Sequence, residues 1–488
     1  MTTAAKIDAL VAWAESHGAV LHPSVEVYHD AATGLSFRVK PTAVTTDGHP
    51  ALPGNFSAAV VRLPSTLSLS YLNAIHPSGS CPPLAAALRN ALPPHVLGRL
   101  LLVREYLAGA SSFWHPYLQC LPQPGGASSE WRLLPPFWDD DDAELLDGTN
   151  LEVGLARVRG DLRREIAAIQ AALRQDHPEE AEATDRRLAD RFTPDLYRWA
   201  YAVFSSRSFR PSLVLAAAQR RLVPAGVAVD DFSVLLPLLD VGNHDMTAPV
   251  RWSILDDGCE LRPGRAHAAP GEQVFNNYGA KTNAELLLGY GFAIPPSAAL
   301  HNDYVHVRSR RGAGNANPGT TEEYLISARP LADASSVLAR GRLPPYLPAE
   351  RAGEVTPAFQ HVAPEMAWDI FAALAPPGVH EALTPEAGAD EVERRLRFLT
   401  GRVGGACLPH FARTAAVMRN KLLQELERLR ETDVEVGEGE GARLTACQRL
   451  ALEYRERCRG VLEGALESMD RDRTLAAAME AMDEEEQE

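Results

Sequence analysis

The apolar residues of this chain follow two different spacings, and the spacing changes several times along the sequence. Residues 3–17 carry apolar side chains three and four positions apart, which predicts an amphipathic helix that ends at Gly18. Residues 19–70 instead form short β-branched and aromatic runs separated by glycine and proline, and these runs predict strands and turns. Helical spacing returns at about residue 83 and continues to about 225.

Strand character resumes at 232 and continues to about 310, and the chain is predicted to be helical again from roughly 322. The order is therefore strands, a helical insertion, strands, and a helical C-terminal part. The two strand regions can form one fold only if the insertion loops out and the chain returns to pair with its first strands. We expect such a fold, which belongs to the α+β class.

One segment of the second strand region, "LLPLLDVGNHDM" at 235–246, begins like a buried strand and then becomes polar. Asp240, Gly242, Asn243 and His244 follow an almost unbroken apolar run. Asp, Gly and Asn are common in turns, so a simple turn would explain the pattern. The same groups could instead face a bound polar ligand, since unpaired polar groups in an apolar core each cost a few kcal/mol.

A second segment, "GEQVFNNYGAKTNAELLLGYGF" at 271–292, predicts a turn, a strand and then a short helix. Thr282 or Asn283 is suited to be the N-cap of that helix. Tyr278 stands where the strand should end, and a tyrosine in such a position more often packs against the core than takes part in catalysis.

Taken together, these two segments resemble the SET-domain protein methyltransferases. An "NH" pair after an apolar strand, followed about 30 residues later by "GEQV…YG.K.NAELLL.YGF", is the pattern of that family. The closer similarity is to the branch that includes the Rubisco lysine methyltransferase and the actin-histidine methyltransferase. Three more stretches resemble successive parts of that family's helical insertion: "SSFWHPYLQCLP" (111–122), "DDAELLDGTNL" (141–151) and "FTPDLYRWAYAVFSSRSF" (192–209).

The resemblance implies a fold and a division of the chain. The fold would be a SET β-fold of short strands with knot-like C-terminal threading, a rare arrangement among proteins. The SET domain would span 1–320, with an N-terminal β part at about 19–80, the insertion at about 83–225 and a C-terminal part at about 226–320. Residues 321–488 would form an all-α domain like the substrate-binding domain of the Rubisco methyltransferase branch, and we expect it to engage a protein substrate.

The cofactor of such enzymes is S-adenosylmethionine, and the resemblance assigns a set of residues to its site. They are Thr33, Gly34, Leu35, Ser206, Arg207, Asp240, Asn243, His244, Tyr278, Tyr290 and Phe292. Arg207 would lie near the carboxylate of the methionine part, while Tyr290 and Phe292 would flank the adenine and the substrate channel. The N-terminal turn departs from the family pattern, in which an acidic residue is usual near Thr33 and a second glycine is expected at Ser36.

The resemblance implies transfer of a methyl group to a lysine or histidine side chain of a protein. We expect Tyr278 to be the catalytic residue, because its hydroxyl could align the nucleophile and, with carbonyl oxygens, hold the methyl group through weak C–H···O contacts. A lysine must first lose a proton from a group whose ordinary pKa is about 10.4, whereas a histidine is neutral near pH 7. No metal is required. The alternative is a SET-like binding scaffold with weak or no activity, which the changes at Thr33 and Ser36 favour.

Charge and composition exclude other classes of function. The net charge of -16 argues against nucleic-acid binding, because the phosphates would be repelled. No stretch approaches the ~20 apolar residues of a membrane span, and the first residues lack the apolar core of a signal peptide. The six cysteines have no CxxC spacing, which indicates reduced thiols in the cytosol or nucleus and no zinc site.

Motifs of other enzyme classes are absent or stand in the wrong context. The sequence has no GxSxG, HExxH or P-loop lysine motif. "VEVGEGEG" at 434–441 resembles the glycine motif of Rossmann-type methyltransferases, but it follows a charged helix end and is predicted to be a flexible linker. His301 and His306 stand on a predicted strand as structural residues, since a metal site would need further ligands.

Overall fold

The computed structural model describes residues 2–41, 59–77, 81–125, 130–175, 183–264, 269–310, 321–384, 390–436 and 444–487. The chain divides into two compact units. Unit 1 consists of Met1–Phe137 with Arg157–Ala280, and unit 2 consists of Trp138–Ala156 with Lys281–Glu488. Residues within each unit contact one another more than they contact the other unit. The predicted boundary near residue 320 separates a SET domain from a substrate-binding domain, and it stays a prediction.

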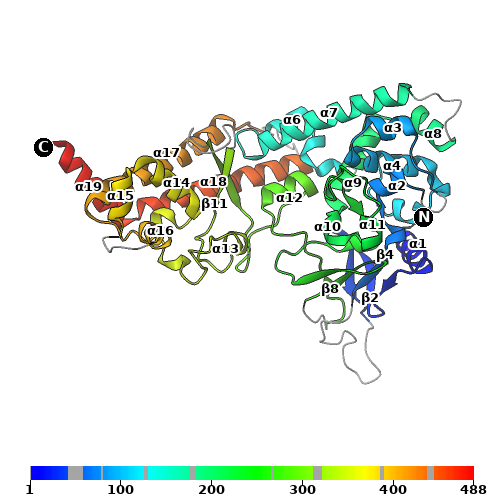
Figure 1. The fold of residues 1–488 in the computed structure, drawn as a ribbon, viewed down its shortest axis with the longest axis horizontal. Helices are drawn as coiled ribbons and strands as arrows, with labels where there is room; N and C mark the ends of the chain where they lie inside the picture. Colours follow the sequence, from blue (N-terminus) through cyan, green and yellow to red (C-terminus); the bar gives the residue numbers. More distant parts are fainter. Residues whose placement is uncertain are drawn as a thin grey trace, which may run out of the picture. The chain divides into compact units, whose positions relative to one another are not determined.

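In the described part of unit 1, three antiparallel sheets each join strands from before the helical insertion to strands from after it (Figure 1). The sheet orders are β1-β4-β8-β7, β2-β3-β9 and β5-β6. The strands are β1 Val20–Leu21, β2 Val25–Asp30, β3 Gly34–Val39, β4 Val61–Pro64, β5 Leu69–Ser70, β6 Val234–Leu235, β7 Val250–Ile254, β8 Gly258–Pro263 and β9 Gln273–Val274. The prediction that the two strand regions form one α+β fold is therefore confirmed.

Apolar cross-strand pairs explain why the chain returns to its first strands. In the pairing of β4 with β8, Val61 lies opposite Leu261 and Leu63 lies opposite Cys259, and all four side chains are buried. Removing these side chains from water stabilises a pairing between residues that are far apart in the sequence.

The helical insertion forms between β5 and β6, as predicted. Its longest apolar helix, α4, is buried on most of its circumference and packs against α2, α8 and α9. The helices of unit 1 are α1 Thr3–Ser16, α2 Tyr71–Ile75, α3 Ala86–Ala91, α4 Pro94–Ala108, α5 His115–Leu118, α8 Ala183–Arg191, α9 Pro194–Arg207, α10 Pro211–Val214 and α11 Ala217–Arg220. Helix α7, Leu151–Gln175, begins in the part of the chain assigned to unit 2, and its residues from Arg157 onward belong to unit 1.

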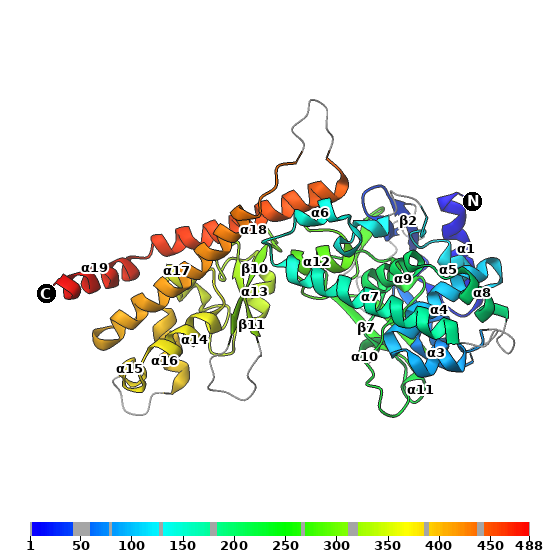
Figure 2. The same cartoon turned by 90° about the horizontal axis from the view of Figure 1, so that it is seen from above.

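Unit 2 contains a β-hairpin and a group of helices. The hairpin pairs β10, Tyr304–Arg310, with β11, Thr321–Ser327. The helices are α6 Asp140–Glu144, α12 Asn283–Tyr290, α13 Val337–Gly341, α14 Pro364–Leu374, α15 Pro377–Ala382, α16 Glu391–Leu399, α17 Leu408–Glu431, α18 Ala446–Asp470 and α19 Arg473–Gln487. Helices α17 and α18 contact each other over part of their lengths (Figure 2). On α17, Leu422, Leu426 and Leu429 are buried and face this core.

The expectation that the chain is helical from residue 322 is wrong at its start. Residues 321–327 form strand β11, in which the buried residues Tyr324 and Ile326 alternate with the exposed Glu323 and the half-buried Leu325. Alternation over so few residues is easily mistaken for one turn of an amphipathic helix, and it is the partner strand β10 that makes the extended conformation favourable.

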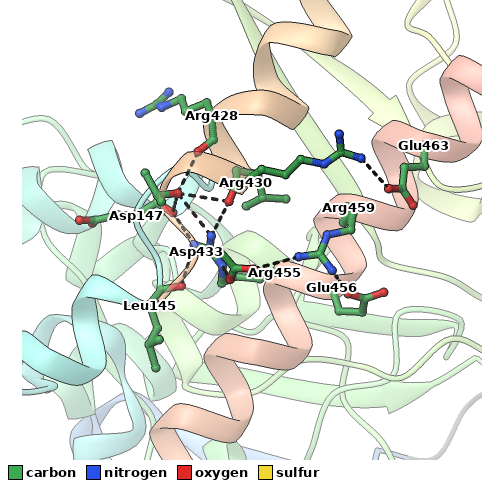
Figure 3. A network of polar contacts seen from close by, with 11 residues as sticks. Leu145, Asp147, Arg428, Arg430, Asp433, Arg455, Glu456, Arg459 and Glu463 are labelled. Atoms are coloured by element: carbon green, nitrogen blue, oxygen red, sulfur yellow. Dashed lines mark hydrogen bonds and ion pairs between the residues drawn. The ribbon is translucent and has the colours of Figure 1, made fainter. Parts of the chain in front are cut away.

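A buried arginine joins three segments of unit 2 (Figure 3). Arg455 on α18 is 2% exposed, and it donates hydrogen bonds to the carbonyl oxygens of Leu145, Asp147 and Leu429. Its Nε lies 3.4 Å from a carboxylate oxygen of Asp433. One side chain thus satisfies backbone acceptors at the end of α17 and in the segment after α6.

All six cysteines are free thiols. Within the described residues, no helix combines the length and the apolar character that a membrane crossing needs.

Candidate functional site

The segment 235–246 forms a turn rather than the buried strand that its apolar run predicted. Strand β6 ends at Leu235, and the chain then enters a 3-10 turn at Leu239–Val241. Leu238, directly before this turn, has a φ of 75°, which is unusual for a residue other than glycine. Pro237 cannot donate to a strand ladder, so the apolar side chains are buried by a tight turn instead.

The turn brings the two predicted segments together. His244 and Asn276 form a parallel bridge, flanked by hydrogen bonds from Asn276 N to the Asn243 carbonyl (2.7 Å) and from Asp245 N to the Asn276 carbonyl (2.9 Å). A Cβ at Gly242 would lie only 3.1 Å from Cβ of Asn276. A side chain at Gly242 would therefore force the two segments apart.

Tyr278 is held against this junction at three points. Its hydroxyl donates to the Gly242 carbonyl oxygen at 2.9 Å, and its backbone N–H donates to Nδ1 of His244 at 3.1 Å. Its ring stacks on the His244 ring with centroids 4.9 Å apart and an angle of 11° between the planes. The phenol oxygen is thereby fixed beside the backbone of the other segment.

The N-terminal turn between β2 and β3 reaches the same place. Asp30 accepts hydrogen bonds from the backbone of Ala32 and Thr33 and from the Thr33 hydroxyl, and these bonds hold the pKa of the exposed Asp30 carboxyl below its ordinary value. The Asn243 side-chain amide in turn donates to the Thr33 hydroxyl oxygen at 2.9 Å. Gly34 has a φ of 75°, and no atom lies within 4 Å of where its Cβ would be.

Ser36, where the resemblance led us to expect a glycine, is accommodated inside the sheet. It is fully buried on β3, and its hydroxyl accepts a hydrogen bond from the Gln273 side chain on β9. The serine therefore strengthens the link between β3 and β9 and does not obstruct the turn.

A hollow of about 320 Å³ lies beside this turn in unit 1. Helix α1, the β2–β3 turn, the segment 119–123 and the end of α9 line it. The lining residues are Thr3, Lys6, Ile7, His29, Gly34, Leu35, Gln119, Cys120, Leu121, Pro122, Gln123, Glu130 and Arg207. Its lining offers two cations, one carboxylate and two amides next to apolar side chains.

Asp240 forms a buried acidic centre next to the hollow. Its carboxylate accepts a hydrogen bond from the Tyr117 hydroxyl at 2.7 Å and lies 4.0 Å from Nη1 of Arg207. Burial raises the pKa of the Asp240 carboxyl to about 6, against the opposing effect of Arg207. Burial and the Asp240 charge raise the pKa of Tyr117 well above its ordinary value, so this phenol stays protonated and acts as a donor.

The predicted site residues fall into three groups. Direct contacts and the common hollow bring together Thr33, Gly34, Leu35, Arg207, Asp240, Asn243, His244 and Tyr278. The hydroxyl of Ser206 donates to the Ala202 carbonyl within its own helix, and Ser206 is not among the residues that line the hollow. Tyr290 and Phe292 lie in unit 2, where their ring centroids are 6.2 Å apart.

Several residues at the site were not predicted. Tyr117, Gln119 and Cys120 stand in "SSFWHPYLQCLP", which resembles a part of the family's helical insertion. The resemblance could have indicated them, but it assigned no residue of this stretch to the site. No sequence pattern marked Lys6 or Glu130 as site residues, because only the packing of the folded chain brings α1 and the segment after 129 to the hollow. Within the described residues, no group of three or more His, Cys, Asp or Glu side chains is arranged to hold a metal ion.

Solved structures with a similar fold exist. The crystal structure of the SET domain of LSMT bound to lysine and AdoHcy matches with a TM-score of 0.57 and 16% identity, over 96% of this chain and 92% of that one. Rubisco LSMT bound to AdoMet matches with a TM-score of 0.54 and 16% identity, over 96% and 92%. The fold is that of Rubisco LSMT. The predicted resemblance to this branch of SET proteins is confirmed.

Relatives by sequence are named as lysine or histidine methyltransferases, and they are larger. Ribosomal lysine N-methyltransferase set10 of Schizosaccharomyces pombe is 31% identical over 225 residues, which are 44% of this chain and 35% of set10. EFM1 of Saccharomyces cerevisiae, a protein-lysine N-methyltransferase, is 25% identical over 321 residues, 60% of this chain and 50% of EFM1. The human actin-histidine N-methyltransferase is 27% identical over 236 residues, 48% of this chain and 34% of its own.

The matched region therefore spans half or less of the length of these relatives. No protein-family model matches the sequence.

Proposed function

We propose that this chain is an S-adenosylmethionine-dependent protein methyltransferase that modifies a lysine or histidine side chain. The observation that carries the proposal is the junction of 243–245 with 276–278, where Tyr278 is fixed next to Asn243 and His244. Relatives named as lysine and histidine methyltransferases, and LSMT structures bound to AdoMet or AdoHcy, support the same reaction.

The residues of unit 1 fit such a cofactor. The methionine part is an amino acid with a carboxylate and an ammonium group, and the hollow offers Arg207 and Lys6 for the first and Glu130 for the second. A buried oxygen of Asp240, Oδ1, has no hydrogen-bond partner among the described residues. The open space over Gly34 leaves backbone accessible to a ligand, which a side chain there would cover.

The chain's own residues would position the nitrogen nucleophile and would not transfer a proton. S-adenosylmethionine, when bound, supplies a sulfonium methyl group whose carbon a neutral nitrogen nucleophile can attack in line, with the thioether S-adenosylhomocysteine as the leaving group. The Tyr278 hydroxyl uses its proton for the Gly242 carbonyl, so its oxygen remains an acceptor for an N–H of the incoming amine or imidazole. Such a hydrogen bond aims the nitrogen lone pair along a fixed direction.

Binding and transfer can be tested separately. Calorimetric titration of the full chain with S-adenosylmethionine should show one saturable site, and incubation of a cell extract with labelled cofactor should then label a protein. Mass spectrometry of the labelled protein identifies the modified residue, which decides between lysine and histidine. Absence of cofactor binding would contradict the proposal and favour the alternative, a SET-like scaffold.

The substrate is proposed to be a protein that contacts the helices of unit 2, and the compartment to be the cytosol or the nucleus. Six free thiols suit a reducing compartment. Cross-linking of the labelled substrate, followed by peptide mapping, should find cross-links to α14 or to α16–α18. Cross-links confined to unit 1 would contradict this role.

A further inference from the structure

Arg207 has donors that the protein itself does not use. Its guanidinium lines the hollow together with Gly34 and Leu35, and its side chain is 23% exposed. The nearest acid is Asp240, whose Oδ2 lies 4.0 Å from Nη1, too far for a hydrogen bond. Within the described residues the guanidinium has this ion pair and no hydrogen bond.

This gap is unexpected for a half-buried arginine next to a buried carboxylate. Arginine and a carboxylate usually meet through two parallel N–H···O bonds, which is their strongest arrangement. The Asp240 side chain is only 1% exposed, and its Oδ1 finds no hydrogen-bond partner among the described residues. Direct pairing would satisfy both groups, so something must hold them apart.

Tyr117 holds the Asp240 oxygen that lies nearest to Arg207. Its hydroxyl donates to Asp240 Oδ2 at 2.7 Å, from a ring that is 2% exposed on α5. On the other side, the backbone of Asp240 is fixed by the 3-10 turn that follows the positive φ of Leu238. The carboxylate is thus held in place from both sides.

We propose that Tyr117 is a positioning residue that keeps Arg207 directed into the hollow by occupying Asp240 Oδ2. The ligand group that Arg207 would then receive is the carboxylate of an α-amino acid, which on the proposed function is that of the cofactor's methionine part. No other ionisable group near Asp240 or Arg207 takes the place of the Tyr117 hydroxyl as a donor to Asp240 Oδ2. These groups are Lys6 on α1, the Cys120 thiol, and Glu130, which is itself an acid.

The first test needs no cofactor. Carbon-13 NMR of aspartate-labelled protein follows the Asp240 carboxyl, assigned by the loss of its signal in Asp240→Asn, and gives its pKa. In Tyr117→Phe the missing hydrogen bond alone would raise the pKa of Asp240, since that bond stabilises the carboxylate. If Arg207 closes onto Asp240 as proposed, the pKa falls instead. A rise or an unchanged value overturns the proposal.

The second test is the affinity for S-adenosylmethionine by calorimetry. Tyr117→Phe should raise the Kd roughly tenfold, since the ligand would lose a charge-assisted hydrogen bond. In an Asp240→Asn background the same change should have no effect, because no acid remains to draw in Arg207. An equal loss in both backgrounds overturns the proposal.

A matched control is available on helix α9. The hydroxyl of Tyr197 also donates to a carboxylate, Glu165 Oε2, at 2.7 Å, and its ring is fully buried. Tyr197→Phe should lower the melting temperature about as much as Tyr117→Phe and leave the Kd unchanged. If Tyr117→Phe does not fold, the pKa of Asp240 in Arg207→Gln decides: it should rise by less than about one unit, since Arg207 makes no hydrogen bond to Asp240, and a larger rise would show direct pairing and overturn the proposal.

The two proposals can fail separately. Absence of cofactor binding by the unmodified protein would contradict the proposed function, while the NMR result would still decide whether Tyr117 separates Arg207 from Asp240.

Discussion

Tyr278 is the residue at which the proposed chemistry can be separated from binding. Tyr278→Phe removes the hydroxyl but keeps the ring that stacks on His244. We expect the Kd for S-adenosylmethionine to stay within about twofold and methyl transfer to fall roughly 100-fold, since a misaligned nucleophile costs about that much. Single-turnover kinetics with labelled cofactor measure both.

Tyr106→Phe is the control for Tyr278→Phe, because Tyr106 packs on Trp199 (ring centroids 4.9 Å apart) away from the junction. Its rate should match that of the unmodified chain. Normal turnover in Tyr278→Phe would show that the hydroxyl does not align the nucleophile.

The same residues show what the sequence can predict about a site. Asn243 and Tyr278 could be found because they interrupt apolar patterns, and such interruptions are costly unless the polar groups have a purpose. Tyr117 could not be found in this way, because a tyrosine in a helical segment fits ordinary packing. Only the structure shows that its hydroxyl points at the Asp240 carboxylate.

At the scale of elements, Arg455 should stabilise the pairing of α17 with α18. Arg455→Met would leave the carbonyls of Leu145, Asp147 and Leu429 without their donor, and we expect the free energy of unfolding to fall by about 3 kcal/mol. Urea denaturation followed by circular dichroism measures it.

Arg459 provides the matched control one turn further along α18 (Figure 3). It pairs with Glu456 and Asp433 at the surface, and its side chain is 29% exposed. Arg459→Met should cost less than about 1 kcal/mol, as exposed ion pairs do. Equal losses in the two variants would show that burial of Arg455 contributes nothing.

Elements were predicted well where one local signal was sufficient. The helix at 283–290 has Thr282 as its N-cap, one of the two residues that the sequence indicated, and Thr282 forms a capping box with Glu285. Strand β11 was missed, and the buried strand expected at the start of 235–246 is only β6, Val234–Leu235. In both cases the conformation is decided by a partner distant in sequence, or by a proline that cannot join a ladder.

At the scale of the whole molecule, three histidines make the stability of unit 2 depend on pH. The rings of His301 and His361 are buried within this unit, and that of His306 is half-buried. Burial lowers the pKa of all three below the ordinary value of 6.5, with Arg329 adding to the effect at His301 and Glu323 opposing it at His306.

The sign of the effect follows from proton counting. Below pH 6.5 these histidines bind protons in the unfolded chain but stay neutral in the folded chain. The free energy of unfolding therefore falls as the pH falls. Each histidine adds a slope of up to about 1.4 kcal/mol per pH unit until its folded pKa is reached. Urea denaturation between pH 7.5 and 5.5 measures the slope above the range in which ordinary carboxylates titrate.

His361→Asn should reduce this slope, because it removes one of the histidines whose pKa is lowered in the folded state. His29→Asn, at an exposed position, should leave the slope unchanged. Asp240 must be counted separately, since its raised pKa of about 6 makes unit 1 more stable as the pH falls through that value. In Asp240→Asn this opposing contribution disappears, so the free energy of unfolding should fall more steeply as the pH is lowered. If the slope is the same in His361→Asn as in the unmodified chain, the buried histidines do not control the acid stability of unit 2.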